Sequence, residues 1–320
     1  MTGLWDGRAK AGASGPTVAA IGECMIEIVR APDGTTSFGY AGDTLNTSVY
    51  LARLGLRPSY VTALGVDPFS DAMLDFWQAE RIAADLVVRR PNKLPGLYIV
   101  TTDMTGERKF HYWRNDSAAR TLFTQPDDEK QLAALDTFPL LYWSGISLAI
   151  LSPPARAHLL DRFARLRKAG TCIVFDPNYR PRLWPDPAAA RSAYTAAFSH
   201  ADLVFTSLED ETPIFGPGDE SVLVGRHKGF GVRELVIKNG HPGSRIVIPD
   251  EGVDLAIDAP PVDHVVDTTA AGDSFAAAYI AARWNGRDPK TAALNGHRLA
   301  GVVCGVRGAI IPSIQMPEDL

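Results

Sequence analysis

The sequence predicts an α/β protein with a mostly parallel central sheet. Short apolar runs alternate with segments whose apolar residues recur at helical spacing, which is the pattern of repeated strand–helix units. The later apolar runs are continuous, as expected for strands that helices cover on both faces. A length of 320 residues accommodates one such domain with a modest insertion as well as it accommodates two domains.

Each predicted element follows from a local pattern. A helix over 44–55, for example, places Leu45, Val49 and Ala52 on one face and stops at Gly55. By the same reasoning, helices are expected at 44–55, 70–80, 153–169 and within 187–198, and strands at 18–22, 60–65, 140–143, 172–175, 203–205 and 235–237.

One insertion departs from the alternation. Residues 97–101 and 109–113 have the composition of two strands joined by a turn at Thr105 and Gly106. The insertion, residues 94–114, is expected to form a small β lid over one end of the sheet together with the stretch around 25–40. Residues 1–15 carry four glycines and no apolar block, so we expect a disordered, frayed tail there.

Composition excludes several classes of function. The net charge is −5, the sequence pI is about 5.8, and no block of Lys and Arg stands out, which argues against binding to nucleic acid or to an anionic membrane. No apolar run is long enough to cross a bilayer. The three cysteines are far apart and form no CxxC pair, so they are expected to be reduced thiols in the cytoplasm.

The stretch 265–275 carries the strongest chemical signal. Two valines, 265–266, are expected to end a strand, a tight turn of small residues follows, and Asp273 opens a helix. The first N–H groups of a helix have no intrahelical partner, and Ala270, Ala271 and Gly272 leave room for a phosphate there. A carboxylate at that position suits a base that takes a proton from an attacking hydroxyl. The alternative is that Asp273 is an ordinary N-terminal helix acid.

Three further motifs lie where predicted strands or turns end. Asp43 and Asn46, after the glycine turn 39–42, can hydrogen-bond a polyol or serve as a turn and helix cap. Arg114 and Arg180 each lie among aromatic residues, which suits a clamp on a carboxylate or phosphate, although either could be a structural ion-pair partner.

Lys238 ends a predicted strand and is followed by the glycines 240 and 243. This pattern suits the phosphates of a nucleotide, or simply a hairpin into 245–248. His111 could contact a substrate. Three other histidines are expected at the surface, namely His158, His200 and His227. The P-loop, GxGxxG and GxSxG motifs are absent.

These motifs together resemble a known family. The run 267–275 resembles the C-terminal signature of the ribokinase-like (PfkB) sugar kinases, and 42–55 resembles their N-terminal one. The stretches most similar to the members that phosphorylate 2-keto-3-deoxygluconate are 42–50, 94–98, 106–115, 178–184 and 307–312. The resemblance covers about residues 17–316 in matching order. It implies one ribokinase-like three-layer α/β/α kinase domain over 16–320 with a β lid.

The resemblance also implies roles for individual residues. Asp273 matches the catalytic base, and the backbone of Ala270, Ala271 and Gly272 matches the anion hole for the transferring phosphoryl group. The sugar acid would be held by Gly42, Asp43, Asn46, Tyr98, Tyr112, Arg114 and Arg180. The nucleotide side would comprise Ser207, Lys238, Gly240 and Gly243 with Ala271 and Gly272. ATP and Mg²⁺ are implied, and whether K⁺ assists stays open.

Two positions depart from the wider family. Ala270 stands where most of its members have glycine, which should be harmless if the φ angle of that residue is negative. The element Asn-x-x-Glu, which organises the Mg²⁺ shell, is replaced by Ser207 and Asp210. Asp210 preserves a carboxylate, with an indirect role toward the metal, whereas Ser207 does not preserve the amide.

The sequence therefore predicts ATP-dependent phosphorylation of 2-keto-3-deoxygluconate at its terminal hydroxyl. The two arginines in aromatic surroundings fit an acidic ligand, and this substrate carries a carboxylate that ribose and fructose lack. The alternatives are a kinase of a neutral sugar, such as a fructokinase, and a non-catalytic sensor of sugar acids. A homo-oligomer is expected because exposed lid strands can pair between subunits.

Overall fold

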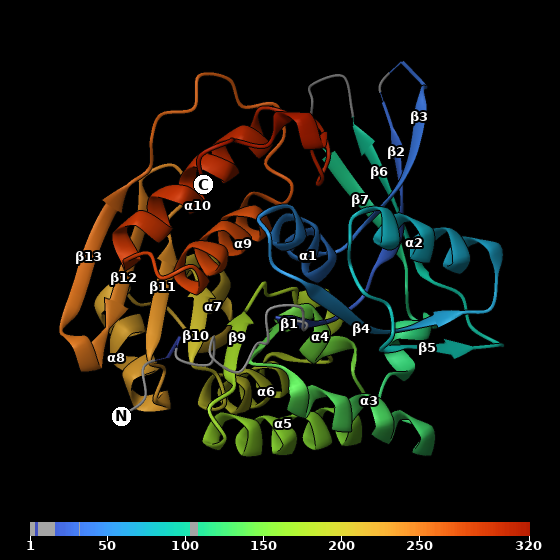
Figure 1. The fold of residues 1–320 in the computed structure, drawn as a ribbon, viewed down its shortest axis with the longest axis horizontal. Coiled ribbons are helices and arrows are strands. Elements are labelled where there is room, and N and C mark those ends of the chain that lie inside the picture. Colours follow the sequence, from blue (N-terminus) through green and yellow to red (C-terminus); the bar gives the residue numbers. More distant parts are fainter. Residues whose placement is uncertain (1–3, 6–16, 32, 103–107) are drawn as a thin grey trace.

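The computed structural model describes residues 4–5, 17–31, 33–102 and 108–320. This part of the chain forms a nine-stranded sheet and a separate four-stranded sheet. Helices cover the larger sheet on both faces, and the smaller sheet stands to one side of it (Figure 1). The predicted three-layer α/β/α arrangement with a small β lid is confirmed.

The larger sheet is mostly parallel. Its strand order is β13 (Val253–Asp258), β12 (Gly243–Ile248), β11 (Glu234–Lys238), β10 (Leu203–Thr206), β9 (Cys172–Asp176), β8 (Leu140–Ser144), β1 (Val18–Ile21), β4 (Pro58–Gly65) and β5 (Val87–Arg90). The strands from β11 to β5 run parallel, while β12 and β13 are antiparallel to their neighbours. All the parallel strands therefore present their carboxyl ends at one edge of the sheet, where ligands of open α/β sheets bind.

Two helical layers bury the sheet. One consists of α1 (Asp43–Arg53), α2 (Pro68–Ala79), α9 (Ala271–Trp284) and α10 (Pro289–Cys304), and the other of α5 (Pro153–Lys168), α6 (Pro187–Ser199) and α8 (Glu220–Phe230) (Figure 1). Neighbouring residues of a strand enter different cores, because Ala20 packs with the first layer and Ile21 with the second. The shorter helices are α3 (Glu129–Ala134), α4 (Gly145–Ile150) and α7 (Leu208–Phe215). Among the described residues, no helix has both the length and the apolar character to span a bilayer.

The lid has the strand order β3 (Thr36–Ala41), β2 (Met25–Arg30), β6 (Gly96–Thr102) and β7 (Arg108–Trp113). The two strands predicted for the insertion are therefore present as β6 and β7. The predicted turn at Thr105 and Gly106 lies outside the described residues. Gly39, expected in a turn, lies in β3 instead, and only Gly42 forms the link to α1.

Two described residues of the N-terminal segment are anchored. Trp5 is buried, and its indole N–H donates to Oε2 of Glu234 at 3.0 Å. The guanidinium of Arg283 lies over the indole ring, 5.5 Å from its centroid. The frayed tail expected over residues 1–15 is therefore wrong at Leu4 and Trp5, and the other positions of that range lie outside the described residues.

The C-terminal segment is fastened to α1. The hydroxyl of Tyr50 donates to the carbonyl of Ala309 at 2.7 Å and accepts from the N–H of Ile311 at 3.2 Å. Arg53 donates to the carbonyl of Ile311 at 2.7 Å. The helix that leads out of the Gly42 turn is thus held by the last part of the chain.

The stretch before α9 is not a strand. Val265 and Val266, expected to end one, are 59 % and 47 % exposed and belong to no sheet. The preceding strand β13 ends at Asp258 as the edge of the large sheet, so the valines have no neighbouring strand to pair with. Their apolar character did not distinguish an exposed loop from a buried strand.

Candidate active site

The first turn of α9 brings the predicted base into contact with α1. Asp273 is the third residue of α9, and Nδ2 of Asn46 donates to its Oδ2 at 2.8 Å. The described residues supply no donor to the other oxygen, Oδ1. One carboxylate oxygen is therefore held by the protein, and the other is left for a ligand.

Burial raises the pKa of Asp273 to about 7, and the negative charge of Asp43 is the next cause. The hydrogen bond from Asn46 and the positive charge of Lys238 lower this pKa, while Asp176 raises it. A pKa near 7 is close to the optimum for a group that takes up a proton at neutral pH. We call Asp43, Asp176, Lys238 and Asp273 the carboxylate cluster, and its electrostatics fit a general base at Asp273.

The turn before α9 departs from one expectation. Ala270, the N-cap residue, has φ +60 and ψ 14, which is the left-handed region. The expectation of a harmless methyl depended on a negative φ, so it is wrong, because this conformation costs an alanine about 1–2 kcal/mol. The N–H of Ala271 donates to the carbonyl of Thr268 at 3.2 Å, so it already takes part in the turn.

The N-terminus of α1 contributes a second carboxylate. Oδ2 of Asp43 accepts from Nδ2 of Asn178 at 2.8 Å. Gly42 is the N-cap residue, and a Cβ there would lie 2.2 Å from the carbonyl oxygen of Glu23, so the close approach of these two segments requires glycine. Asp43 and Asn46 serve both the helix start and the cluster, because Oδ1 of Asp43 accepts from the N–H of Thr44 at 2.9 Å and Oδ1 of Asn46 accepts from the N–H of Gly42 at 3.4 Å.

Lys238 extends from the end of β11 into the same cluster. Its Nζ donates to Oδ2 of Asp176 at 2.7 Å, and a Cβ added to Gly272 would lie 3.3 Å from this nitrogen. Burial lowers the pKa of Lys238, but Asp176 and Asp210 outweigh it, so the net shift is upward and the lysine stays charged. A positive charge therefore lies next to the turn that was predicted to bind phosphate.

Asp176 itself has an unused acceptor. Its Oδ1 is buried and accepts no hydrogen bond from any residue that the structure describes. Burial is the largest cause that raises the pKa of this carboxyl, and Lys238 opposes it. A buried oxygen without a donor is unusual and indicates that a ligand, a water or an ion completes the site.

Ser207 and Asp210 have structural partners of their own. Ser207 caps α7, since its hydroxyl accepts from the N–H of Asp210 at 3.0 Å and lies 2.9 Å from Oδ2 of the same residue. Oδ1 of Asp210 accepts from the N–H of Tyr179 at 2.9 Å. The carboxylate of Asp210 raises the pKa of both Asp176 and Lys238, which places it near that pair.

The predicted lid residues differ in their surroundings. The hydroxyl of Tyr98 donates to Glu27 at 2.5 Å, and the ring packs against that of Tyr112 at a tilt of 35°, with the centroids 5.6 Å apart. Arg114 is buried and is paired with Glu23, which is also buried. The structural ion-pair role that the sequence left open for Arg114 is therefore realised.

Arg180 is different because it is exposed. Its Nη1 donates to the carbonyl of Tyr179 at 2.9 Å, and the described residues offer its guanidinium no carboxylate. Of the two arginines, Arg180 is therefore the one whose charge is uncompensated.

The glycines after Lys238 form a hairpin between β11 and the antiparallel strand β12, which was one of the two predicted alternatives. Gly240 has φ +64 and Gly243 has φ +127, so both adopt backbone conformations that favour glycine. A Cβ on Gly243 would also lie 2.0 Å from the carbonyl oxygen of Ile257. Backbone geometry alone accounts for both glycines.

One histidine was placed wrongly. His227, expected at the surface, is 1 % exposed, and its Nε2 lies 2.5 Å from Oε1 of Glu211. Glu211 also accepts from Thr206 and Arg226, so the group is a buried hydrogen-bonded network, in which Nδ1 of His227 has no partner among the described residues. His111 lies on the lid, 3.4 Å from the hydroxyl of Thr101.

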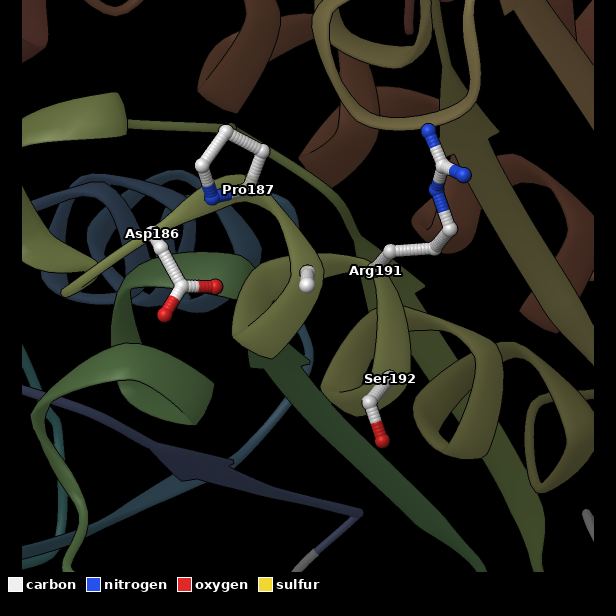
Figure 2. Close-up of a pocket in the computed structure, with 5 residues that line it drawn as sticks. Asp186, Pro187, Arg191 and Ser192 are labelled. Carbon is white, nitrogen blue, oxygen red and sulfur yellow. The ribbon is translucent and has the colours of Figure 1, made fainter.

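The surface pockets do not coincide with this cluster. A pocket of about 640 Å³ lies on α6 and is lined by Asp186, Pro187, Ala188, Arg191 and Ser192 (Figure 2). None of these residues belongs to the carboxylate cluster. We place the candidate site at the cluster, because its charged groups converge at the carboxyl ends of the parallel strands.

Several residues of the cluster were not predicted as site residues. Asp176 is the last residue of the buried strand β9 and Asn178 lies two positions after it, and polar residues at a strand end are the signal that could have identified them. Glu23 and Asp267 also follow predicted strand ends, at 18–22 and 265–266, but their partners are distant in the sequence, as is that of Glu27, which had no strand-end signal.

The chain is similar to known proteins in sequence and in fold. The model of the pfkB family carbohydrate kinases matches residues 16–316. A 2-dehydro-3-deoxygluconokinase of Dickeya dadantii is 45 % identical over 94 % of this chain and 98 % of its own, and that of Escherichia coli K12 is 44 % identical over the same shares. The structure of an E. coli putative ribokinase II in complex with ATP and Mg²⁺ superposes with a TM-score of 0.79 at 22 % identity, covering 92 % of this chain and 94 % of that one.

Proposed function

The chain belongs to the pfkB family of carbohydrate kinases, and we propose that it transfers the γ-phosphoryl group of ATP to 2-keto-3-deoxygluconate, also called 2-dehydro-3-deoxygluconate. The acceptor is the terminal 6-hydroxyl, and the product is 2-keto-3-deoxy-6-phosphogluconate. The relatives that share 44–45 % of its residues over nearly their whole length carry this activity in their names.

The arrangement around Asp273 carries the proposal. Asn46 holds Oδ2, so Oδ1 accepts the proton of the sugar hydroxyl as that hydroxyl attacks phosphorus. In this proposal the backbone of Ala270, Ala271 and Gly272 forms the anion hole, and the N–H of Gly272 faces the charge that develops on the phosphoryl oxygens, since the N–H of Ala271 donates to Thr268 within the turn. Placing a base next to an anion site favours an in-line meeting of an alcohol and a triphosphate.

The sugar acid is assigned to the groups around the root of the lid. Gly42, Asp43 and Asn46 take the hydroxyl groups, because they are polar groups at the N-terminus of α1 beside the base. In the same proposal, Tyr98 and Tyr112 cover the sugar from the lid, and the substrate carboxylate is bound by Arg180 and Arg114.

The nucleotide is assigned to the other side of Asp273. Lys238 would approach its phosphates, and the hairpin glycines Gly240 and Gly243, together with Ser207, would line that side. Bound Mg²⁺ neutralises phosphate charge and orients the triphosphate. Oxygen ligands suit it, and the unpartnered Oδ1 of Asp176 fits this requirement, with Asp210 beside it. Within the described part of the chain, no three His, Cys, Asp or Glu side chains form a metal site.

A kinase of a neutral sugar is the second candidate. The observation that favours it is the ion pair between Arg114 and Glu23, because a guanidinium already paired with a carboxylate has less affinity for another. Arg180 would then be the only arginine of the two that is available to an acid.

The deciding experiment is a coupled ADP-release assay with 2-keto-3-deoxygluconate, fructose and ribose, with the product identified by mass spectrometry. We expect ADP release with the acid at least about tenfold faster than with either neutral sugar, and a fall in kcat of on the order of 10²–10⁴ for Asp273→Asn. Preference for fructose would favour the kinase of a neutral sugar. Absence of ADP release with every sugar would favour a non-catalytic sensor of sugar acids.

The same proposal includes an oligomer held by the lids. The strands β3 and β7 form the edges of the lid sheet, and Phe38 and Trp113 on them are 54 % and 59 % exposed. Light scattering coupled to gel filtration measures the assembly.

We also propose the cytoplasm as the location of the protein, since all three cysteines are free thiols. A comparison of kcat in K⁺ and in choline buffers tests the open question of a monovalent cation.

A further inference from the structure

The lid is joined to the turn before α9 by one arginine. Arg108 begins β7, and its Nη1 donates to Oδ1 of Asp267 and to the hydroxyl of Thr269. Asp267 lies three positions before Ala270 in the chain. The contact therefore connects a lid strand directly to the turn that we propose takes the transferring phosphoryl group.

Asp267 shapes that turn. Its Oδ1 accepts from the N–H of Thr269 at 3.0 Å and from the hydroxyl of Thr269 at 2.7 Å, and its Oδ2 accepts from the N–H of Gly308 at 2.9 Å. Its side chain is only 5 % exposed. One buried carboxylate thus fixes the turn, the C-terminal segment and the lid relative to one another.

The charge of Arg108 matters as much as its position. Burial acts to raise the pKa of Asp267, but the hydrogen bonds from Gly308 and Thr269 and the charge of Arg108 outweigh it, so the group is ionised at neutral pH. An unpaired negative charge beside this turn would repel an incoming triphosphate, because charges interact strongly where solvent is partly excluded. Arg108 removes that repulsion.

The orientation of Arg108 is supported by its own strand. Its guanidinium lies over the ring of Phe110, 5.3 Å from the ring centroid. Residues 108, 110, 112 and 114 of an extended strand face the same side, so Arg108 shares its face with Tyr112, whereas Lys109 faces the opposite side.

We propose that Arg108 is a positioning residue that couples closure of the lid over the sugar to assembly of the phosphoryl site, by binding Asp267 and neutralising its charge. This inference rests on the proposed function, because the turn must be the phosphoryl site. It makes sugar binding and nucleotide binding interdependent through a residue that touches neither ligand.

The test compares Arg108→Ala with Lys109→Ala, a matched control on the same strand whose side chain is exposed. Steady-state kinetics give kcat and KM for ATP with 2-keto-3-deoxygluconate. Calorimetry gives the affinity for a non-hydrolysable ATP analogue with and without the sugar acid. Guanidinium chloride at about 20 mM, compared with sodium chloride at the same ionic strength, tests whether a free cation can replace the missing side chain.

We expect Arg108→Ala to lower kcat/KM for ATP by about 10- to 100-fold. Guanidinium should then raise the kcat/KM of this variant at least about fivefold. The sugar acid should strengthen binding of the ATP analogue to the wild type and to Lys109→Ala, but not to Arg108→Ala. In the Asp267→Asn background, Arg108→Ala should have a smaller effect, because the charge it neutralises is gone.

Three outcomes would overturn the inference. They are wild-type kinetics for Arg108→Ala, a loss that guanidinium does not restore, and a loss accompanied by an equal loss in Lys109→Ala. Failure of the proposed function is a separate result. It would appear as a wild-type protein that releases no ADP with any sugar, and the analogue binding would then still report whether Arg108 supports the anion site.

Discussion

The side-chain amide of Asn46 donates to the carboxylate of Asp273 across 227 positions of the chain, at 2.8 Å. This bond joins the first turn of α1 to the first turn of α9. It also lowers the pKa of Asp273, while the nearby Asp43 raises it. Removal of the Asn46 hydrogen bond and removal of the Asp43 charge should therefore move the pKa of the base in opposite directions.

The first prediction concerns this titration. Because Asp273 must lose its proton to act as the base, kcat/KM should rise with pH through an apparent pKa near 7 and then level off. Asn46→Ala should shift this limb to higher pH by about one unit, because it removes a hydrogen bond to the ionised form. Asp43→Asn should shift it to lower pH. The test is to measure kcat/KM of the wild type and both variants between about pH 5 and pH 9. Two pKa shifts of the same sign would contradict the assignment of Asp273 as the base.

The second prediction separates the two arginines. Arg180→Ala should cost roughly 2–5 kcal/mol in kcat/KM for the sugar acid and leave folding stability nearly unchanged, because the side chain is exposed. Arg114→Ala should in addition lower the free energy of unfolding by about 3–5 kcal/mol, since Glu23 would be left buried without a partner. Urea unfolding and kinetics with the acid and with fructose test both statements. Equal stability of the two variants would argue against the structural role of Arg114.

The third prediction concerns the left-handed alanine. Ala270→Gly should raise the free energy of unfolding by about 0.5–1 kcal/mol, because glycine adopts φ +60 without strain but has more freedom in the unfolded chain. Ala271→Gly is the matched control, and it should lower stability by about 0.5–1 kcal/mol because Ala271 lies within the helix. Thermal unfolding of both variants gives the signs, and a destabilised Ala270→Gly would refute the strain.

The fourth prediction concerns the N-terminal anchor. Trp5→Ala should lower the free energy of unfolding by about 3 kcal/mol, because a buried indole is removed from the core. The value of kcat should stay unchanged, because Trp5 lies far from the site. Its partner Glu234 is at the start of β11, whereas Lys238, which belongs to the site, is at the opposite end of that strand. The free energy of unfolding of Trp5→Phe should lie between those of the wild type and Trp5→Ala. A loss of activity without a loss of stability would disprove a purely structural role.

The residues of the site could be predicted from the sequence better than the contacts that position them. Asp273, Lys238 and Asp43 were identified because polar residues at strand ends or helix starts converge at one edge of a parallel sheet, and the structure brings them together. The same rule covers Asp176, which was not selected although it follows a buried strand. These features depend on local patterns that a single sequence displays.

The remaining features depend on contacts between distant segments. Glu23 and Arg114 are 91 positions apart, so nothing near Arg114 indicated that it was already paired. His227 is buried and bonded to Glu211, which lies 16 positions away, and the turn before Ala270 is bonded to Asp267. Val265 and Val266 look like a strand but have no strand beside them.

The bonds of Gly308 to Asp267 and of Ala309 to Tyr50 bear on the order in which the protein matures during translation. The strands from β1 to β11 can assemble while the ribosome is still producing the end of the chain. Asp267 gains its backbone donor, and α1 its final tether, only when residues 308–311 have emerged. Kinase competence is therefore acquired only after residues 308–311 have been made, and a chain cut immediately before Gly308 should be folded in its sheet yet inactive.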